Sequence, residues 1–109
     1  MITHAVNIRT SKYDIYIGRA GHGMDGYFGN PIILGEICPV CGNLHLTGDS
    51  TLTCYQTWLI TKVQEDPEYR RRVKELQGCR LGCFCKPKSC HGDYLSRMVE
   101  YLNRSQEDV

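Results

Sequence analysis

The chain has 109 residues, of which 41% are hydrophobic and 23% are charged, and this fits one domain with a single thin core. Thirteen Lys and Arg against twelve Asp and Glu give a net charge of +1. This total predicts neither a uniformly basic protein that coats nucleic acid nor an acidic protein that mimics it. No run approaches the ~18 apolar residues of a membrane helix, and the chain starts without a secretory pattern. We therefore expect a cytoplasmic protein with no membrane partner.

The first third of the chain predicts strands and a loop. Residues 4–8 and 14–17 are β-branched and aromatic, which predicts two strands, and a polar turn at residues 10–12 could join them as a hairpin. Six glycines between Gly18 and Gly35 oppose both helix and strand. They predict a long loop, and long loops in compact domains usually carry function.

The remainder predicts three helices and a third strand. A helix is expected to start at Asp49 or Ser50, either of which could cap it, because apolar residues then recur with helical spacing. The sequence Asp66-Pro67-Glu68 is typical of a helix start, and the second helix is expected to run from there to Gly78. Residues 80–85 predict a strand, and a last helix begins near Ser89 or Cys90. Its apolar face comprises Tyr94, Leu95, Met98, Val99 and Leu102.

These elements predict a small α+β or α/β domain with about three strands and about three helices. We expect one domain over residues 1–109, with an inserted zinc knuckle at about residues 37–54. Residues from about 103 to 109 form a polar tail that we expect to fray.

Seven cysteines are far above ordinary usage. An odd count without an export signal argues against a disulfide framework, so their close spacings favour metal ligation or thiolate chemistry.

The sequence Cys38-Pro39-Val40-Cys41-Gly42 is typical of a zinc knuckle, because two intervening residues let both sulfurs reach one tetrahedral ion. Two further ligands are needed, and the nearest are His45 and Cys54. The predicted zinc site is therefore Cys38, Cys41, His45 and Cys54. The alternative is a surface loop with idle thiols, with Cys54 as a small core residue of a helix.

A second group spans residues 82–93. Cys83 and Cys85 on a strand would point to one face, and Cys90 and His91 follow at a helix start, where thiol pKa values fall and anions bind. Three interpretations stay open. In the first, Cys83, Cys85, Cys90 and His91 form a second metal site. In the second, the group is a reactive site that uses Cys90, His91 or Asp93 as acid, base or nucleophile. In the third, the cysteines are packed in the core and His91 caps the helix.

Six ordered motifs span nearly the whole chain: Val6-Asn7-Ile8-Arg9, Tyr16-Ile17-Gly18-Arg19, Phe28-Gly29-Asn30-Pro31, Tyr55-Gln56-Thr57-Trp58-Leu59, Leu81-Gly82-Cys83-Phe84-Cys85 and Cys90-His91-Gly92-Asp93. In this order they resemble a small family of uncharacterised bacterial and phage proteins. Phe28 and Phe84 stand where that family usually has tryptophan, and residues 37–46 look like an insertion. The resemblance implies a phage or mobile-element setting but no settled activity.

The motif residues also predict a ligand pocket. Arg19, Asn30, His91 and Asp93 are of the types that bind phosphate, ribose or base edges, and they follow strand ends or begin a helix. Each has an ordinary alternative as a salt bridge, a turn former or a helix cap.

Charge is concentrated between Arg70 and Cys90, where seven Lys and Arg accompany one acid, Glu75. This segment could face nucleic acid or a nucleotide phosphate, or it could be a solvated helix face.

The sequence thus favours a zinc-binding cytoplasmic domain with a nucleotide- or nucleic-acid-directed role. Two alternatives are an enzyme that acts on a nucleotide-like substrate through Cys90, His91 and Asp93, and a phage protein that binds a host protein through the basic helix.

Overall fold

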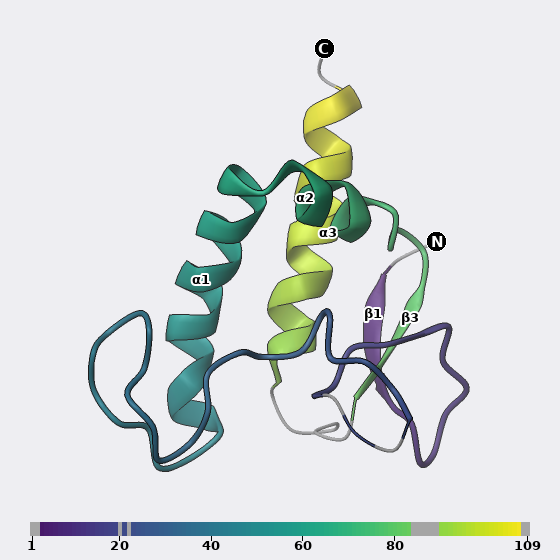
Figure 1. Ribbon diagram of the computed structural model, residues 1–109. Coiled ribbons are helices and arrows are strands. Elements are labelled where there is room, and N and C mark those ends of the chain that lie inside the picture. The colour runs from purple at the N-terminus through teal and green to yellow at the C-terminus, as the bar shows by residue number, and fades with distance from the viewer. Residues whose placement is uncertain (1–2, 20, 22, 84–89, 108–109) are drawn as a thin grey trace.

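The computed structural model describes residues 3–19, 21, 23–83 and 90–107, and it forms a small α+β domain (Figure 1). Its elements are β1 (His4–Asn7), β2 (Ile15–Tyr16), a 3-10 turn η1 (Asp49–Thr51), α1 (Leu52–Glu65), α2 (Pro67–Lys74), β3 (Arg80–Cys83) and α3 (His91–Glu107). Helix α3 contacts β1 and β3, while α1 and α2 contact α3 and each other. The expected fold class, with three strands and three helices, is confirmed.

The three strands form a parallel sheet in the order β1-β3-β2. Leu81 of β3 pairs with Ala5 on one side and with Ile15 on the other. The two N-terminal strands were therefore predicted, but the hairpin between them is wrong. Residues 8–14 cross over β3 so that β2 runs in the same direction as β1.

Gly82 makes this crossing possible. A Cβ atom on Gly82 would lie 2.6 Å from Cγ2 of Ile8 and 2.7 Å from Cγ of Tyr13. Real Cβ contacts are essentially never this short, so the crossing segment lies where a side chain would otherwise stand.

Helix α1 buries Tyr55, Leu59 and Val63, as its predicted apolar stripe requires. Neither Asp49 nor Ser50 caps it with a side-chain hydrogen bond, because both lie in the preceding 3-10 turn. Instead, the Ser50 hydroxyl donates to the carbonyl oxygen of Thr47, at 2.7 Å.

Helix α2 starts as predicted. The Asp66 carboxylate accepts a hydrogen bond from the Tyr69 backbone N–H at 3.0 Å, and Pro67 occupies the first turn. The helix ends at Lys74 rather than at Gly78, which follows with a φ of 80° that favours glycine.

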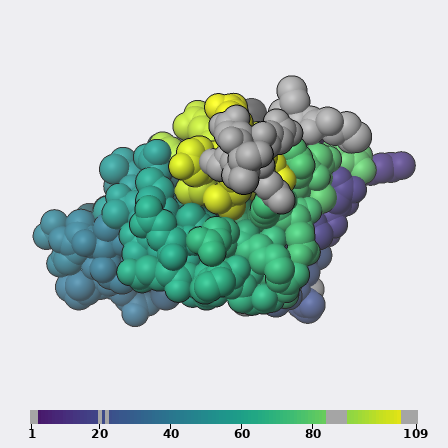
Figure 2. All heavy atoms as spheres, turned by 90° about the horizontal axis from the view of Figure 1, so that it is seen from above, coloured from purple at the N-terminus to yellow at the C-terminus, as the bar shows by residue number. Residues whose placement is uncertain are grey.

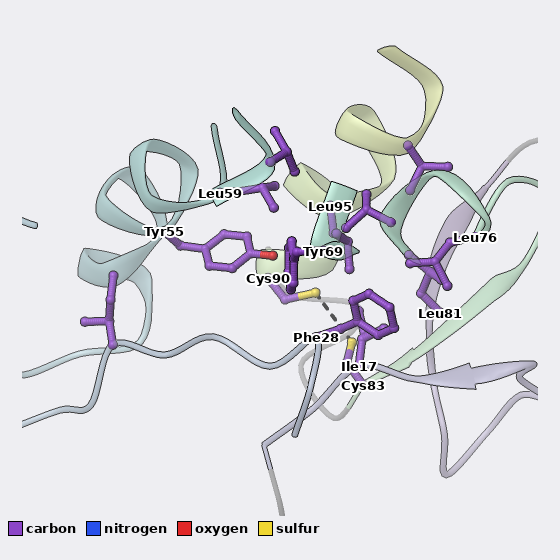
Figure 3. Close-up of a cluster of buried hydrophobic side chains, with 14 of the residues drawn as sticks. Ile17, Phe28, Tyr55, Leu59, Tyr69, Leu76, Leu81, Cys83, Cys90 and Leu95 are labelled. Atoms are coloured by element: carbon purple, nitrogen blue, oxygen red, sulfur yellow. Dashed lines mark hydrogen bonds between the residues drawn. The ribbon is translucent and has the colours of Figure 1, made fainter. Parts of the chain in front are cut away.

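Helix α3 buries Leu95 completely against the rest of the core (Figure 3). Val99 of the same helix is also fully buried. The helix continues to Glu107 and so includes the first part of the segment that we expected as a polar tail. The Asn103 amide donates to the carbonyl oxygens of Val99 and Lys74, at 2.8 and 3.1 Å. No helix in the described part of the chain is long and apolar enough to cross a membrane.

The Asp66 cap predicts a pH dependence of stability. The Tyr69 N–H, followed by the Lys62 ammonium, lowers the pKa of Asp66 below its ordinary value. A carboxylate whose folded pKa is lowered stabilises the fold above its unfolded pKa, and this contribution is lost as the pH falls through the folded pKa. We expect Asp66→Ala to lower the urea midpoint of unfolding at neutral pH. We expect the difference in midpoint between this variant and wild type to become smaller in acid.

Glu65→Ala removes the same charge from the neighbouring position and serves as the control for urea unfolding as a function of pH. A gap between Asp66→Ala and wild type that is equally large in acid would contradict this account of the cap.

Candidate functional site

The segment before α1 folds into a tight turn around two thiols. The Cys38 N–H donates to the carbonyl oxygen of Asn43 at 2.8 Å, and Gly42 has a φ of 78°. The backbone N–H groups of Val40 and Cys41 point at the Cys38 sulfur, at 3.4 and 3.5 Å. This geometry brings both thiols of the predicted knuckle to the same side of the turn.

Cys38, Cys41, His45 and Cys54 each offer one ligand atom, and all four atoms lie within 4.8 Å of one another. Three come from the turn, and Cys54 comes from the first part of α1. The Sγ of Cys41 lies 3.5 Å from Nε2 of His45. We call these residues the Cys3His group; it could hold a metal ion.

The thiols of this group differ electrostatically. Burial raises the pKa of Cys38, but the Cys41 and Val40 N–H groups outweigh it, with His45 and the Cys41 thiol adding to the effect, and the pKa falls to about 6. Burial, followed by hydrogen bonding to Cys41 and Cys38, raises the pKa of Cys54 to about 11. One thiolate is therefore stabilised by the fold, whereas further thiolates beside it require a cation.

His45 is oriented by Ser50. Its Nδ1 lies 3.0 Å from the Ser50 Oγ, whose single proton is already donated to Thr47. Nδ1 must therefore carry the proton of the neutral ring and donate it to Ser50. This tautomer leaves the lone pair of Nε2 facing Cys41, as a metal ligand requires.

The second thiol group is arranged differently. The sulfurs of Cys83 and Cys90 are buried 3.4 Å apart (Figure 3), and Cys85 lies outside the described residues. Nε2 of His91 lies 2.7 Å from the carbonyl oxygen of Ile17, and the ring packs edge-on against Tyr55. Within the part of the chain that the structure describes, the Cys3His group is the one set of three or more potential ligands that converges.

The candidate catalytic residues Cys90, His91 and Asp93 lie at the start of α3 or directly before it. Cys90 and His91 are buried, and the Asp93 carboxylate accepts from the Cys90 N–H at 3.1 Å. The Cys83 thiol, followed by burial, raises the pKa of Cys90, and burial lowers the pKa of His91. Both residues are therefore neutral and packed against other groups.

Arg19 and Asn30 meet in a pocket of about 300 Å³. Its lining residues come from the glycine-rich loop and α1: Arg19, Gly26, Tyr27, Gly29, Asn30, Pro31, Ile33 and Trp58. His91 and Asp93, which the sequence predicted as ligand-binding residues beside these two, are not among the lining residues. The pocket does contain Tyr27 and Trp58, which sequence reasoning had not assigned to a site.

Helix α1 connects the pocket with the Cys3His group. Cys54 and Trp58 are four residues apart, so they lie on the same side of the helix. The Asn30 amide donates to the Thr51 hydroxyl at 2.9 Å and accepts from the Ile32 N–H at 3.0 Å. The glycine-rich loop is thereby fastened to the start of α1.

The fold and the Cys3His group define a small α+β domain with a potential metal centre. The chain belongs to the family described as Domain of unknown function (DUF4326), whose model matches residues 2–101. An uncharacterised 12.4 kDa protein from the nrdA-td intergenic region of Enterobacteria phage T4 is 32% identical over 61 residues, which are 56% of this chain and 56% of that protein. No solved structure matches the chain. The family match and the phage relative confirm the resemblance to a small uncharacterised family with phage members.

Proposed function

We propose that the chain is a zinc-binding domain with a nucleotide- or nucleic-acid-directed role, in a phage or mobile-element setting. The convergence of three thiols and one imidazole within 4.8 Å carries the zinc part of the proposal. Three cysteines and one histidine are a common ligand set of structural zinc sites, and soft thiolates do not suit Mg²⁺ or Ca²⁺. Four protein ligands would leave no open position, so the zinc would be structural.

The surroundings of the group support a structural role. Figure 2 shows the segment around residue 40 as a lobe at one end of the molecule, and Ile37, Leu44 and Leu46 on it are exposed. A lobe whose large aliphatic side chains face solvent buries little apolar surface of its own. A metal bound by Cys38, Cys41 and His45 of the lobe and by Cys54 of α1 would fix it to the helix.

Elemental analysis of the purified, reduced chain tests the zinc proposal. We expect one zinc per chain, retained when Cys79, which lies outside both thiol groups, is changed to serine. A reduced protein that contains no zinc and takes up none when it is offered would refute the proposal.

Removing the hydroxyl that orients His45 should weaken zinc binding. Ser50→Ala takes away the acceptor of the Nδ1 proton, so the ring is free to turn and the ligand tautomer is no longer fixed. Losses of such supporting hydrogen bonds typically cost about 10- to 100-fold in metal affinity. Competition with a chromophoric chelator measures this, with Thr53→Ala, an exposed change on α1, as the control. Equal affinities of Ser50→Ala and Thr53→Ala would show that Ser50 does not support the ligand.

The pocket supports the nucleotide-directed part of the proposal more than the basic helix does. Arg71 of α2 is ion-paired with Glu68 and Glu75, and the guanidinium of Arg72 lies 4.6 Å from the centre of the Tyr27 ring. Part of the basic charge of α2 is thus already engaged. Equilibrium binding of nucleotides and of single-stranded oligonucleotides at low salt tests this role. Binding of either that weakens as salt rises supports it, and binding of neither refutes it.

A further inference from the structure

We infer that the pocket beside Trp58 binds a free nucleoside monophosphate, with the base against Trp58 and the phosphate at Arg19. This inference rests on the proposed nucleotide-directed role and names the ligand class for it. The volume of about 300 Å³ is at the lower end for small-molecule sites, which suits a single nucleotide.

The aromatic walls of the pocket are fixed from behind by a buried ring. Tyr69 is buried, and its ring contacts both Tyr27, stacked at 5.3 Å between centres, and Trp58, edge-on at 5.7 Å. Trp58 also stacks on Tyr55, at 5.9 Å. The indole of Trp58 and the phenol of Tyr27, which both line the pocket, are therefore held in place before binding, as a site for a planar base requires.

The charge of the pocket selects an anion. Arg19 is the one charged residue among those that line it, and the Arg72 guanidinium over Tyr27 adds a second positive charge nearby. One N–H of Arg19 donates to the carbonyl oxygen of Ile32 at 2.6 Å, which anchors the side chain. The guanidinium has five N–H donors, so four remain to bind a phosphate.

Asn30 supplies the hydrogen-bonding groups that a base edge needs. Its amide uses one N–H on Thr51 and one oxygen lone pair on Ile32. A second N–H and a second lone pair remain on a side chain that these two bonds hold still. A donor and an acceptor on one amide form the pairing by which asparagine binds base edges.

A single nucleotide fits these features better than a polymer. A strand of nucleic acid requires a basic groove that follows several phosphates. This chain has a net charge of +1, and Arg19 is the one cationic side chain that lines the pocket. The ligand is thus bound by one aromatic wall, one guanidinium and one amide.

Fluorescence titration of the zinc-loaded chain of residues 1–109 tests the inference, because Trp58 is the one tryptophan in the sequence. The probes are AMP, GMP, CMP and TMP, with the four matching nucleosides, inorganic phosphate and a single-stranded oligonucleotide for comparison. We expect at least one monophosphate to quench Trp58 saturably, with the matching nucleoside about tenfold weaker because it lacks the charge-assisted hydrogen bonds. Inorganic phosphate should leave the emission unchanged.

Two matched pairs of variants locate the site. Ile33 is 49% exposed and lines the pocket, whereas Leu34 is 44% exposed and does not line it. Ile33→Glu should weaken monophosphate binding at least tenfold, and Leu34→Glu should bind like wild type. Arg19→Gln should bind nucleotide and nucleoside equally, whereas Arg70→Gln should keep the difference. Thermal unfolding of each variant shows whether it is folded.

Three results would overturn the inference. A nucleoside that binds as tightly as its monophosphate removes the role of Arg19. Binding of the oligonucleotide without any monophosphate refutes the inference while the proposed nucleic-acid role stands. Binding of no probe refutes both, and the zinc content then decides the remaining part of the proposed function by itself.

Discussion

Replacement of Cys38 and Cys41 together by serine should remove one zinc per chain and lower the melting temperature by about 10 to 20 °C. The physical reason is that a metal bound by residues 38 and 54 closes a chain loop, as a disulfide over a similar span does. Without the metal, the lobe around residue 40 has little buried apolar surface to keep it on α1. Elemental analysis and thermal unfolding of the reduced protein measure the two effects.

Cys79→Ser is the control for this experiment, because Cys79 lies outside the Cys3His group. It should keep the zinc. An unchanged zinc content in the Cys38→Ser/Cys41→Ser variant would contradict the assignment of these ligands.

Gly82→Val should destabilise the fold by about 3 kcal/mol or more. Gly82 is buried in the central strand, and any Cβ there collides with Ile8 and Tyr13 of the crossing segment, so β1 and β2 cannot both pair with β3 as they do. Urea unfolding measures the loss.

Gly48→Ala is the matched control, since no atom lies within 4 Å of a Cβ at Gly48 and its φ of −59° suits alanine. It should leave stability unchanged or slightly raised. A Gly82→Val protein as stable as wild type would show that residues 8–14 can move away from the new side chain at little cost, and this would contradict the account of the crossing.

Local sequence signals predicted the elements that local chemistry determines. The Asp66-Pro67 start of α2 and the buried stripe of α1 follow from capping and from helical spacing, and both are present. The pairing of strands depends instead on the contacts of Gly82 with Ile8 and Tyr13, which lie 74 and 69 positions before it in the sequence. A polar turn at residues 10–12 is compatible with a hairpin, and only the close approach of Ile8 and Tyr13 to Gly82 shows why the chain crosses β3.

The Cys3His group could be predicted for a related reason. Three of its members lie within eight residues, so one turn brings them together, and Cys54 was the nearest further thiol. The pocket was predicted only in part, because it forms when the glycine-rich loop folds onto α1 through Asn30 and Thr51. The spacing of Cys54 and Trp58 on one helix face was visible in the sequence, but it could not show that Tyr27 would line the same pocket as Trp58.

The surroundings of His91 could not be predicted from its motif. Its place beside Cys90 and Asp93 at a helix start suggested catalysis or ligand binding. In the fold, its ring is buried and bonded to the Ile17 carbonyl, which joins the start of α3 to the residue that follows β2. This contact joins residues 74 positions apart, so no local sequence signal could show it.

X-ray absorption spectroscopy of the zinc-loaded, reduced protein tests the central claim most directly, because it reports the atoms bound to the metal. The Cys3His assignment predicts three sulfurs at about 2.3 Å and one imidazole nitrogen at about 2.0–2.1 Å from zinc. A shell of four sulfurs, or one dominated by oxygen and nitrogen, would contradict the assignment of Cys38, Cys41, His45 and Cys54 as the ligands.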